Sequence, residues 1–443
     1  MTRSLVAIVG RPNVGKSSLF NALAGRRISI ISDESGTTRD RVTAPVEWAG
    51  GEFTLVDTGG VDFDTGNAFA AHIREQVDIA IELADVVVFL VDGMDGVTPA
   101  DSDIAQILRR SKKPVVLAVN KLDNIKREEE IFDFYRLNLG EPVGISCTQK
   151  RGLGDLLDKI CANFDKQPPY DDGARKKIAI VGKPNAGKSS IINRLVGEKR
   201  VMVSEISGTT RDRIDLPFNY MGREYILTDT AGVRRKRSVE VETVEFYSVL
   251  RALNAIRESD VCIIVLDATQ GITEQDVRLA GYVHNECKPS VIVVNKWDIA
   301  GDGLESDRKT DKEELFKRWN ARLSADLAFM PYFKAVFCSA VTGQRIGDIM
   351  RAVELVLKNA EKRITTGKLN QMFLDFAAVN PTLAKIKYAT QASVCPPTFA
   401  VFVGKSKLLS PTYVRYLENS LRKEVDFTGT PIRIFIREKG EKE

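Results

Sequence analysis

The chain contains 443 residues, with 64 Lys and Arg against 60 Asp and Glu, and 43% of its residues are hydrophobic. Domains commonly span about 150 residues, so this length predicts about three domains and the composition excludes a wholly disordered chain. No apolar run reaches the roughly 18 residues that span a bilayer, and the N-terminal residues lack a signal-peptide pattern, so we expect a cytoplasmic protein. The six cysteines show no metal-ligand spacing, and we expect reduced core thiols.

The first part of the chain alternates strands with amphipathic helices. The β-branched runs LVAIVG, FTLVDT, VVVFLVD and PVVLAVNK predict buried parallel strands, and AFAAHIREQVDIAIELA predicts a helix between them. This alternation is typical of a doubly wound, mostly parallel α/β sheet, in which ligands bind at the carboxyl ends of the strands. The segment KQPPYDDGARKK that follows has the proline, glycine and charge of an exposed linker.

The next part of the chain repeats the first. GRPNVGKSSLFNALAG at Gly10 returns as GKPNAGKSSIINRLVG at Gly182. At the same offset of 172 residues, SGTTRDR returns unchanged and DTGGV returns as DTAGV. The strand-like runs KIAIVG, YILTDT, VCIIVLD and SVIVVNK follow in the same order. We interpret residues 1–165 and 177–360 as two copies of one domain, joined by a linker at residues 166–176.

Residues 361–443 lack the repeated motifs. KLNQMFLDFAAVN and SPTYVRYLENSLRKEV predict helices, whereas KIKYATQAS, TFAVFVG and TPIRIFIREK predict strands. The region carries 14 Lys and Arg against 8 Asp and Glu, a net charge of +6, so the remainder of the +4 chain has a net charge of −2. We therefore expect a small basic α+β domain, and in a chain so close to neutral any nucleic-acid-binding surface must be local.

The motif GxxxxGK[ST] between a strand and a helix is the phosphate-binding loop, and it occurs twice. Its glycines let backbone N–H groups turn toward phosphates at a helix N-terminus. Lys16 and Lys188 are expected to reach the β- and γ-phosphates, and Ser17 and Ser189 to bind Mg²⁺. A third candidate, VGKS at residues 403–406, has Phe399 at the position of the first glycine, and we interpret it as a turn that ends a strand.

The motif NKxD follows the fourth strand of each copy and predicts guanine specificity. A carboxylate facing the N1–H and N2–H₂ edge of guanine accepts two charge-assisted hydrogen bonds, which adenine cannot donate. Asp123 and Asp298 have this position, and Asn120 and Asn295 are expected to brace the loops. Because the motif follows GxxxxGKS and DxxG in order, we interpret it as functional in both copies.

The order of these motifs resembles the Era/TrmE-like, translation-factor-like P-loop GTPases over nearly all of residues 1–360. The resemblance implies that further Mg²⁺ ligands are an aspartate, acting through water, and a switch threonine in each copy, namely Asp57, Asp229, Thr38 and Thr210. It implies a γ-phosphate sensor at Gly60 and Gly232, and loops that cover the guanine at Ser146 (SCT) and Ser339 (CSAV). The GTP-binding residues that it implies are Gly10, Arg11, Pro12, Asn13, Val14, Gly15, Lys16, Ser17, Asp57, Thr58, Gly59, Gly60, Val61, Asn120, Lys121, Asp123 and Ser146 in the first copy, and Gly182, Lys183, Pro184, Asn185, Ala186, Gly187, Lys188, Ser189, Asp229, Thr230, Ala231, Gly232, Val233, Asn295, Lys296, Asp298, Ser339 and Ala340 in the second.

The residue that would orient the hydrolytic water is absent from its usual place. Val61 and Val233 follow DxxG where a glutamine would stand, and valine cannot bind a water, so intrinsic turnover is expected to be slow. Neither histidine, His72 or His284, lies near a motif.

An asparagine inside each phosphate loop offers another source of catalysis. In the hydrophobic-substituted GTPases that the copies resemble, the equivalent of Asn13 and Asn185 helps to bind K⁺ beside the phosphates, where it supplies the charge of an arginine finger. The alternative is an asparagine that only ties the loop together. We expect potassium-stimulated hydrolysis, with the catalytic residues Lys16, Lys188, Asn13, Asn185, Thr38 and Thr210.

Two GTPase copies followed by a small basic domain resemble the family of bacterial double GTPases known as Der or EngA over the whole chain. The family implies a factor in assembly of the large ribosomal subunit, with GTP and GDP as substrate and product, and with a C-terminal KH-like domain that contacts ribosomal RNA. The chain departs from ordinary KH domains because residues 361–443 contain no GxxG loop, so shape and phosphate contacts are expected to bind the RNA.

The two switch regions differ in charge. Residues 234–237 of the second copy are RRKR, whereas the first copy has the acidic VDFDTG at the same place. The RRKR run has two interpretations. It is either a group of solvated surface charges, or a nucleotide-dependent contact with RNA or a neighbouring domain. The acidic first switch, with Asp62 and Asp64, could pack against the basic domain in one nucleotide state.

The sequence predicts a cytoplasmic, monomeric GTPase whose nucleotide state controls the arrangement of its domains on a pre-ribosomal particle. One rival function is a nucleotide-sensing scaffold with little turnover, which the valines after DxxG keep open. A second rival is a GTPase of tRNA modification. That role requires a catalytic cysteine and a folate-binding region in the related family, and neither is found here. No DNA or membrane partner is expected.

Overall fold

The computed structural model describes residues 4–24, 43–48, 51–57, 77–78, 80–81, 84–111, 113–123, 125–164, 175–197, 201–203, 215–229, 251–300, 312–379, 386–404 and 411–438. The chain divides into two compact units, which are residues 1–171 with 239–250 and residues 172–238 with 251–443. Within the described ranges, no helix is long and apolar enough to cross a lipid bilayer.

The first unit contains a six-stranded sheet in the order β2-β3-β1-β4-β5-β6, with β2 antiparallel and the other strands parallel. The chain leaves the central strand β1 first for one side of the sheet and then for the other, so the loop after β1 lies at a topological switch point. The elements are β1 (Ser4–Val9), α1 (Lys16–Ala24), β2 (Thr43–Trp48), β3 (Gly51–Asp57), β4 (Val86–Asp92), α3 (Pro99–Arg110), β5 (Val115–Asn120), the 3₁₀ helix η1 (Ile125–Leu137), β6 (Val143–Gly144) and α4 (Leu153–Ala162).

The edge strand β2 is an element that the sequence patterns did not predict. Its sequence TAPVEW contains Pro45, and only Val46 in it is buried. Proline has no backbone N–H to donate to a neighbouring strand, which suits the edge position of β2, where it pairs with β3 alone. Strong apolar runs identify central strands and miss such edges.

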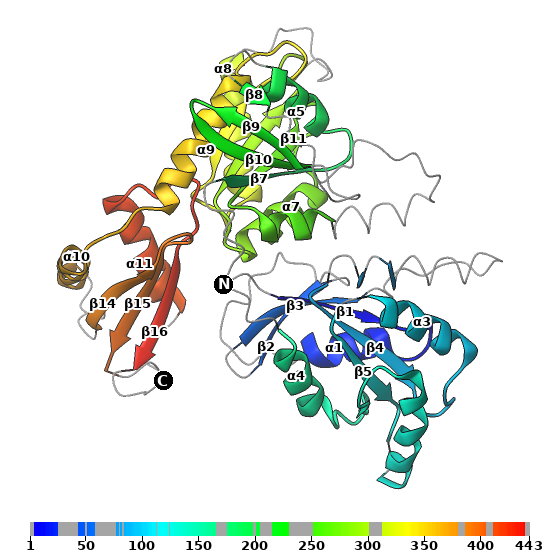
Figure 1. The fold of residues 1–443 in the computed structure, drawn as a ribbon. Coiled ribbons are helices and arrows are strands. Elements are labelled where there is room, and N and C mark those ends of the chain that lie inside the picture. Colours follow the sequence, from blue (N-terminus) through cyan, green and yellow to red (C-terminus); the bar gives the residue numbers. More distant parts are fainter. Residues whose placement is uncertain are drawn as a thin grey trace. The chain divides into compact units, whose positions relative to one another are not determined.

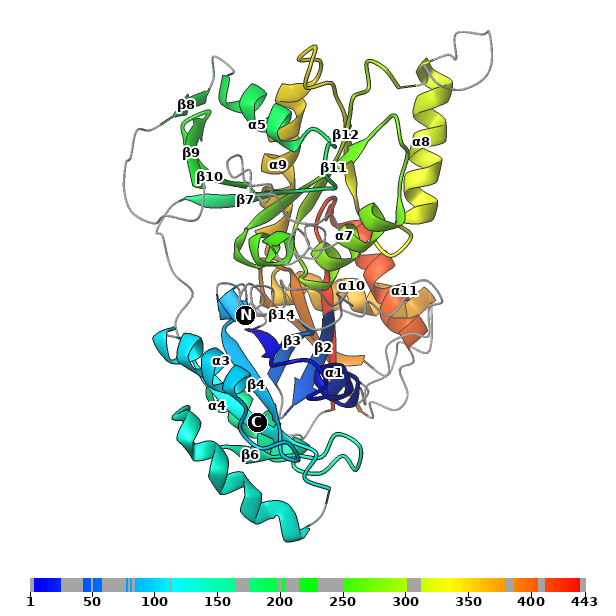
Figure 2. The same ribbon diagram turned by 90° about the vertical axis from the view of Figure 1, so that its right-hand side faces the viewer.

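The second unit repeats the sheet in the order β13-β12-β11-β7-β10-β9-β8. Strands β7, β10, β11, β12 and β13 are parallel, and β9 and β8 extend one edge in antiparallel pairs. Figure 2 shows α9 lying along this sheet beside α5. The elements are β7 (Lys176–Val181), α5 (Lys188–Gly197), β8 (Val201–Val203), β9 (Asp215–Tyr220), β10 (Arg223–Asp229), β11 (Val261–Asp267), α7 (Glu274–Asn285), β12 (Ser290–Asn295), α8 (Lys312–Asp326), β13 (Lys334–Phe337) and α9 (Ile346–Ala360).

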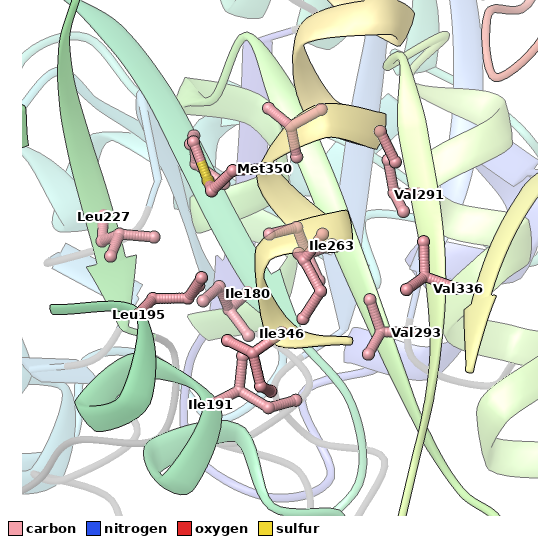
Figure 3. Packing of buried hydrophobic residues seen from close by; sticks show 14 of the residues in the cluster. Ile180, Ile191, Leu195, Leu227, Ile263, Val291, Val293, Val336, Ile346 and Met350 are labelled. Atoms are coloured by element: carbon pink, nitrogen blue, oxygen red, sulfur yellow. The ribbon is translucent and has the colours of Figure 1, made fainter. Parts of the chain in front are cut away.

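Apolar side chains fill both faces of this second sheet. On the face covered by α5 and α9, Ile180, Ile263 and Val293 of the strands meet Ile191 and Met350 of the helices (Figure 3). The other face packs against α7 and α8. Burying one such side chain stabilises the fold by about 1.5–3 kcal/mol, so strands buried on both faces dominate the stability of the sheet.

The same second unit also contains the small C-terminal domain predicted from residue 361 onward. Its three-stranded sheet has the order β14-β15-β16, with β14 antiparallel and β16 parallel to β15, and α10 and α11 lie beside it (Figure 1). The elements are α10 (Thr366–Val379), β14 (Ile386–Ser393), β15 (Thr398–Val403), α11 (Pro411–Glu424) and β16 (Arg433–Glu438). Strand β15 ends at Val403, as expected for the VGKS turn.

The C-terminal domain is joined to the second nucleotide-binding domain by backbone hydrogen bonds. The turn after α11 inserts Gly429, whose N–H donates to the Tyr332 oxygen at 2.6 Å and whose oxygen accepts from Ser290 N–H at 2.8 Å. The guanidinium of Arg422 lies 4.5 Å from the centre of the Tyr332 ring, and His284 Nδ1 is 2.8 Å from the Tyr332 hydroxyl. His284 is therefore a helix residue of α7 at this junction.

The cysteines agree only in part with the expectation of core thiols. All six are free, and three of them are buried, namely Cys147, Cys262 and Cys338. Cys161 and Cys287 are partly exposed, and Cys395 is exposed at the end of β14. The expectation is wrong for Cys395, because the spacing of cysteines in a sequence excludes a metal site without telling which thiols are covered.

Candidate nucleotide-binding sites

The first phosphate loop, residues 10–17, connects β1 to α1. Gly10 and Gly15 have positive φ angles of 155° and 97°. The ammonium of Lys16, 8% exposed, donates to the backbone oxygens of Gly10 at 2.8 Å and Arg11 at 3.0 Å. The loop thus curls around its own lysine, with Ser17 exposed at the first turn of the helix.

The second phosphate loop, residues 182–189, has the same geometry. Lys188 is 7% exposed and donates to the oxygens of Gly182 at 2.7 Å and Lys183 at 2.8 Å. Gly187 has a φ of 95°, close to its counterpart in the first loop. The repeat in the sequence is therefore also a repeat in backbone conformation.

The electrostatics of the first loop favour an anion close to Lys16. Burial lowers the pKa of the Lys16 ammonium to about 8, and the nearby carboxylate of Asp57 opposes this shift. Asp57 is 1% exposed at the carboxyl end of β3, where it is paired in register with Ile8 of β1. A buried lysine of this kind is best stabilised by a bound phosphate.

A strap connects the NKxD motif to the phosphate loop in both copies. The Asn120 side chain donates from Nδ2 to the Val14 oxygen at 2.8 Å, and its Oδ1 accepts from Cys147 N–H at 3.1 Å. In the second copy, Asn295 donates to the Ala186 oxygen at 2.9 Å and accepts from Ala340 N–H at 3.0 Å. One amide therefore joins three loops, which meet at the carboxyl ends of the strands.

The two specificity carboxylates differ in their hydrogen bonds. Asp123 Oδ1 accepts from the Ser146 hydroxyl at 2.5 Å and from the Thr148 hydroxyl at 3.1 Å. Asp298 Oδ1 is buried and has no hydrogen-bond partner among the residues that the structure describes. A buried carboxylate oxygen without a donor is costly, and an external N–H donor would satisfy it.

The loops at Ser146 and Ser339 have matching architectures although their sequences match unequally. The Gln149 N–H donates to the Ser146 hydroxyl at 3.1 Å, and the Thr342 N–H donates to the Ser339 hydroxyl at 3.1 Å. Both serines are fully buried. The poorer SCT motif therefore folds like CSAV, because the turn depends on the serine and on the backbone that follows it.

An acidic residue at the end of the third buried strand completes each site and was missed by the sequence analysis. Asp92 lies 2.5 Å from the ammonium of Lys121, and Asp267 lies 2.7 Å from that of Lys296. Both lysines have positive φ angles, 70° and 63°. The repeated acid that ends VVVFLVD and VCIIVLD was the signal that could have identified these residues.

A buried ion pair under each phosphate loop was missed as well. Arg11 Nε lies 3.5 Å from Asp101, and Lys183 Nζ lies 3.5 Å from Asp276. Both aspartates are almost fully buried and belong to capping boxes that open α3 and α7. The second loop residue is therefore coupled to a helix N-terminus in each copy, by arginine in one and lysine in the other.

The asparagines of the phosphate loops stand at the loop tips. Asn13 and Asn185 are exposed and adopt left-handed φ angles of 65° and 63°, a conformation that asparagine tolerates better than most residues. Neither side chain has a hydrogen bond within the described ranges. The described residues therefore give no support to the alternative that these asparagines only stabilise the loop by hydrogen bonds.

Several predicted site residues lie outside the part of the chain that the structure describes. They belong to the two switch regions and include the RRKR run at residues 234–237 and the acidic Asp62 and Asp64. His72, which was not predicted to be a site residue, also lies outside the described residues. The Asp229 backbone ends β10, but its side chain also lies outside the description. The others are Thr38, Thr58, Gly59, Gly60, Val61, Thr210, Thr230, Ala231, Gly232 and Val233.

Comparison with known proteins agrees with this duplicated arrangement. The profile of a family described as 50S ribosome-binding GTPase matches residues 5–121 and 177–296, and a profile described as the C-terminal KH-domain-like region of EngA bacterial GTPases matches residues 363–437. The chain is 46% identical to GTPase Der of Alkaliphilus oremlandii, covering 99% of both chains. It is 47% identical to GTPase Der of Clostridium kluyveri and 48% identical to that of Clostridium perfringens, covering 100% of each. The chain therefore belongs to the GTPase Der family, with two tandem P-loop GTPase domains and a C-terminal KH-like domain.

Proposed function

We propose that each phosphate loop binds a guanine nucleotide and that the protein hydrolyses GTP to GDP and phosphate while it acts in ribosome assembly. The observation that supports this most is the duplicated strap, in which Asn120 and Asn295 fix the position of NKxD against the phosphate loop. A phosphate site and a base site held at one fixed separation suit a nucleotide and not a free phosphate.

Base selection is assigned to Asp123 and Asp298. Asp298 Oδ1, which has no hydrogen-bond partner among the described residues, could accept hydrogen bonds from the N1–H and N2–H₂ groups of guanine. In the first site, the Ser146 and Thr148 hydroxyls donate to Asp123 and orient its carboxylate. Asp123→Asn and Asp298→Asn reverse the donor pattern. Each variant is expected to lose GDP binding at its own site and to gain xanthosine diphosphate, and GDP binding that stays unchanged would contradict the assignment.

The residues at each site also fit Mg²⁺, which would neutralise phosphate charge and bridge the β- and γ-phosphates when bound. The first site offers the exposed hydroxyl of Ser17 and the buried carboxylate of Asp57, and oxygen donors of these types are those that Mg²⁺ prefers. Ser189 and Asp229 are their counterparts in the second site. The switch threonines Thr38 and Thr210 would complete the two sets of ligands with GTP bound.

Potassium stimulation is proposed for both sites because Asn13 and Asn185 stand exposed at the loop tips, with side chains free to contact an ion near the phosphates. The cation would supply positive charge where Val61 and Val233 replace a water-orienting glutamine. Turnover is expected to be faster in KCl than in NaCl at equal ionic strength. Asn13→Ala with Asn185→Ala should remove the difference, and equal rates in the two salts for the unchanged protein would exclude it.

The rival function, a sensor that binds GTP and barely hydrolyses it, is separated from this proposal by kinetics. Phosphate release over many turnovers in KCl identifies an enzyme, whereas release that stops at or below two phosphates per protein molecule, one for each site, identifies a sensor. Lys16→Ala and Lys188→Ala, tested singly, show which site turns over. The tRNA-modification rival is not favoured, because the full-length relatives are named GTPase Der.

The target is proposed to be the large ribosomal subunit or its precursor, with ribosomal RNA as the contact. Support comes from the matched family, whose description names 50S ribosome binding, and from the +6 charge of residues 361–443. Sedimentation of the protein with purified subunits in a GTP analogue or in GDP is the test. Association with the large subunit that depends on nucleotide is expected, and association with neither subunit would overturn the proposal.

The switch of the second copy is assigned the nucleotide-dependent contact. The RRKR run at residues 234–237 lies directly after the γ-phosphate sensor in the sequence. Charge reversal of Arg234, Arg235 and Lys236 is expected to weaken the association with subunits in the GTP-analogue state, and unchanged association would contradict the assignment. The acidic first switch is proposed to face the basic domain in one nucleotide state.

The domain boundaries at residues 1–165, 166–176, 177–360 and 361–443, the monomeric state and the cytoplasmic location are part of the same proposal. A monomer in the cytoplasm would bring one first GTPase domain, one second GTPase domain and one KH-like domain to a ribosomal particle. Analytical ultracentrifugation of the free protein tests the monomeric state, and a concentration-dependent shift to a dimer would contradict it.

A further inference from the structure

One face of the three-stranded sheet in the C-terminal domain carries an aromatic and basic patch. Along β15, Phe399, Val401 and Val403 are buried against α10 and α11. Side chains alternate across a strand, so Ala400 and Phe402 lie on the opposite face. Among the described residues, no helix covers that face.

Three aromatic side chains lie on that face, and we call this set, Tyr388, Phe402 and Phe435, the sheet-face aromatics. Tyr388 of β14 is the Cα partner of Phe402, and their ring centres lie 5.9 Å apart. Phe435 of β16 is the Cα partner of Ala400 on the same face. Tyr388 is 45% exposed and Phe435 is 51% exposed, and exposed rings gathered in one place mark a binding surface.

The strand register places one basic side chain beside these rings. Arg437, exposed on β16, is the Cα partner of Phe402 and therefore stands on the same face. The three strands contain Lys387, Arg433 and Arg437 against a single acid, Glu438. Within the described residues, Arg437 has no carboxylate partner, so its guanidinium is available to an external anion.

The composition of the face distinguishes between possible ligands. The described residues that share it are aromatic, small or basic, whereas the aliphatic Ile434 and Ile436 of β16 pack into the core on the other side. Protein-docking faces are also rich in Tyr, Phe and Arg, so charge separates the two kinds of ligand: residues 361–443 have a net charge of +6, which suits a polyanion. Aromatic rings interleaved with arginines are the arrangement that stacks unpaired bases and pairs with phosphates.

We propose that the sheet-face aromatics form a stacking platform for single-stranded RNA, with Arg437 contacting a phosphate of the same strand. This site would take over the task for which the chain has no GxxG loop. It rests on the proposed function in ribosome assembly, because that function supplies the RNA. It adds a binding face and a mode of contact, in which bases stack on rings, to the phosphate contacts expected from charge alone.

The test uses the full-length protein and a fluorescent single-stranded RNA of twelve nucleotides, with binding followed by anisotropy. Tyr388→Ala and Phe435→Ala are each expected to raise the Kd about tenfold, since a stacked base contributes on the order of one factor of ten. Tyr388→Phe keeps a ring and should bind like the unchanged protein. A duplex of the same sequence, whose bases are not available for stacking, should bind with an affinity that these variants do not alter.

Matched controls lie on the other side of the domain. Leu374→Ala removes an apolar side chain that is 65% exposed on α10, and Lys423→Glu reverses an exposed charge on α11. Both variants should leave the Kd for single-stranded RNA within about twofold of the unchanged protein. Arg437→Glu, which reverses the same charge on the sheet face, should raise the Kd much more than Lys423→Glu does. Circular dichroism of each variant confirms that the domain is folded.

Crosslinking identifies the contacted residues directly. With 4-thiouridine in the RNA, adducts are expected on peptides that contain Tyr388, Phe402 or Phe435. If the protein binds RNA but the adducts lie elsewhere and the alanine variants bind normally, the platform is wrong and the proposed function stands. If the variants lose a protein contact of the ribosome while RNA binding is unchanged, the face is a protein-docking site and the platform is again wrong. Failure to associate with any ribosomal subunit would instead remove the proposed function.

Discussion

The amide of Asn120 donates a hydrogen bond of 2.8 Å to the backbone oxygen of Val14, and Asn295 donates one of 2.9 Å to Ala186 in the other copy. Each amide also accepts an N–H from the third loop of its site. The NKxD motif is therefore bonded directly to the phosphate loop in each copy. The phosphate loop and the NKxD loop of each copy are therefore held together by the same asparagine side chain.

This relationship predicts that removing the asparagine affects phosphate binding. Asn120→Ala leaves a buried oxygen and a buried N–H unpaired, which together cost about 3 kcal/mol and correspond to about a hundredfold weaker GDP binding. The measurement is GDP titration in a Lys188→Ala background, which silences the second site. Asn163→Ala is the control, because it removes an exposed amide whose one hydrogen bond among the described residues is to the Lys159 oxygen. An equal Kd for both variants would contradict the prediction.

The same strap explains why a glycine occupies the loop beside it. A Cβ added at Gly15 would collide with Asn120 Nδ2, and one at Gly187 would collide with Asn295 Nδ2. Gly15→Ala is therefore expected to displace the loop and to weaken GDP binding by at least tenfold, again with Lys188→Ala present. Gly96 also has a positive φ, 66°, but nothing lies within 4 Å of its Cβ position. Gly96→Ala carries the backbone strain alone, so GDP binding that suffers equally in both variants would refute the steric explanation.

Much of this site was predictable from sequence because the motifs encode local backbone geometry. GxxxxGKS and NKxD predicted where Lys16 and Asn120 would lie, and the apolar runs predicted four of the five parallel strands around them, missing the two-residue strand β6. The pair between Arg11 and Asp101 was not predictable, because the two residues are ninety positions apart and belong to separate motifs, the phosphate loop and the capping box of α3. Contacts of this kind depend on how α3 packs, which apolar periodicity does not specify.

The C-terminal domain shows a similar limit. Its helices and strands followed from periodicity, but the aromatic face did not, because Phe402 and Phe435 look like core residues in an alternating strand. Only the pairing register places them on the face opposite α10. Strand β2 was not predicted either, because its short sequence TAPVEW contains Pro45 and lacks an apolar run.

Lys16 is expected to take up a proton when nucleotide binds. Burial lowers its pKa from 10.5 to about 8 in the free protein, and a bound phosphate favours the ammonium form and raises the pKa again. At pH 8 about half of the lysines are neutral, so GDP binding should take up about half a proton, and affinity should fall as the pH rises above 8.

Calorimetry of GDP binding at pH 8, in two buffers of different ionisation enthalpy, measures this uptake. The titration uses the Lys188→Ala background, and Lys16→Arg is the control because arginine does not titrate in this range. Folding stability depends on pH in the opposite direction to GDP affinity. Between about pH 8 and 10.5 the free folded protein binds fewer protons than the unfolded chain, so its free energy of unfolding increases as the pH rises. Binding enthalpies that are identical in both buffers would show that Lys16 is already charged.

The turn at Gly429 is expected to control the docking of the C-terminal domain on the second GTPase domain. Its φ is 73°, and an added Cβ would collide with Val356 of α9. Gly429→Ala should therefore weaken the junction by about 2–4 kcal/mol, through strain at a positive φ and overpacking. Hydrogen exchange reads this out at the Ser290 amide, which donates to the Gly429 oxygen at 2.8 Å and should lose protection.

Gly222→Ala is the matched control for this junction. Gly222 also has a positive φ, 81°, in the turn between β9 and β10, and nothing lies within 4 Å of its Cβ position. The Ser290 amide should keep its protection in this variant, because only the backbone strain is shared. Since β12 begins at Ser290 and ends at Asn295 of the NKxD motif, a junction that loosens is also expected to weaken GDP binding at the second site and not at the first. Loss of protection with unchanged binding at both sites would show that strand β12 does not transmit the docking of the domain to the nucleotide.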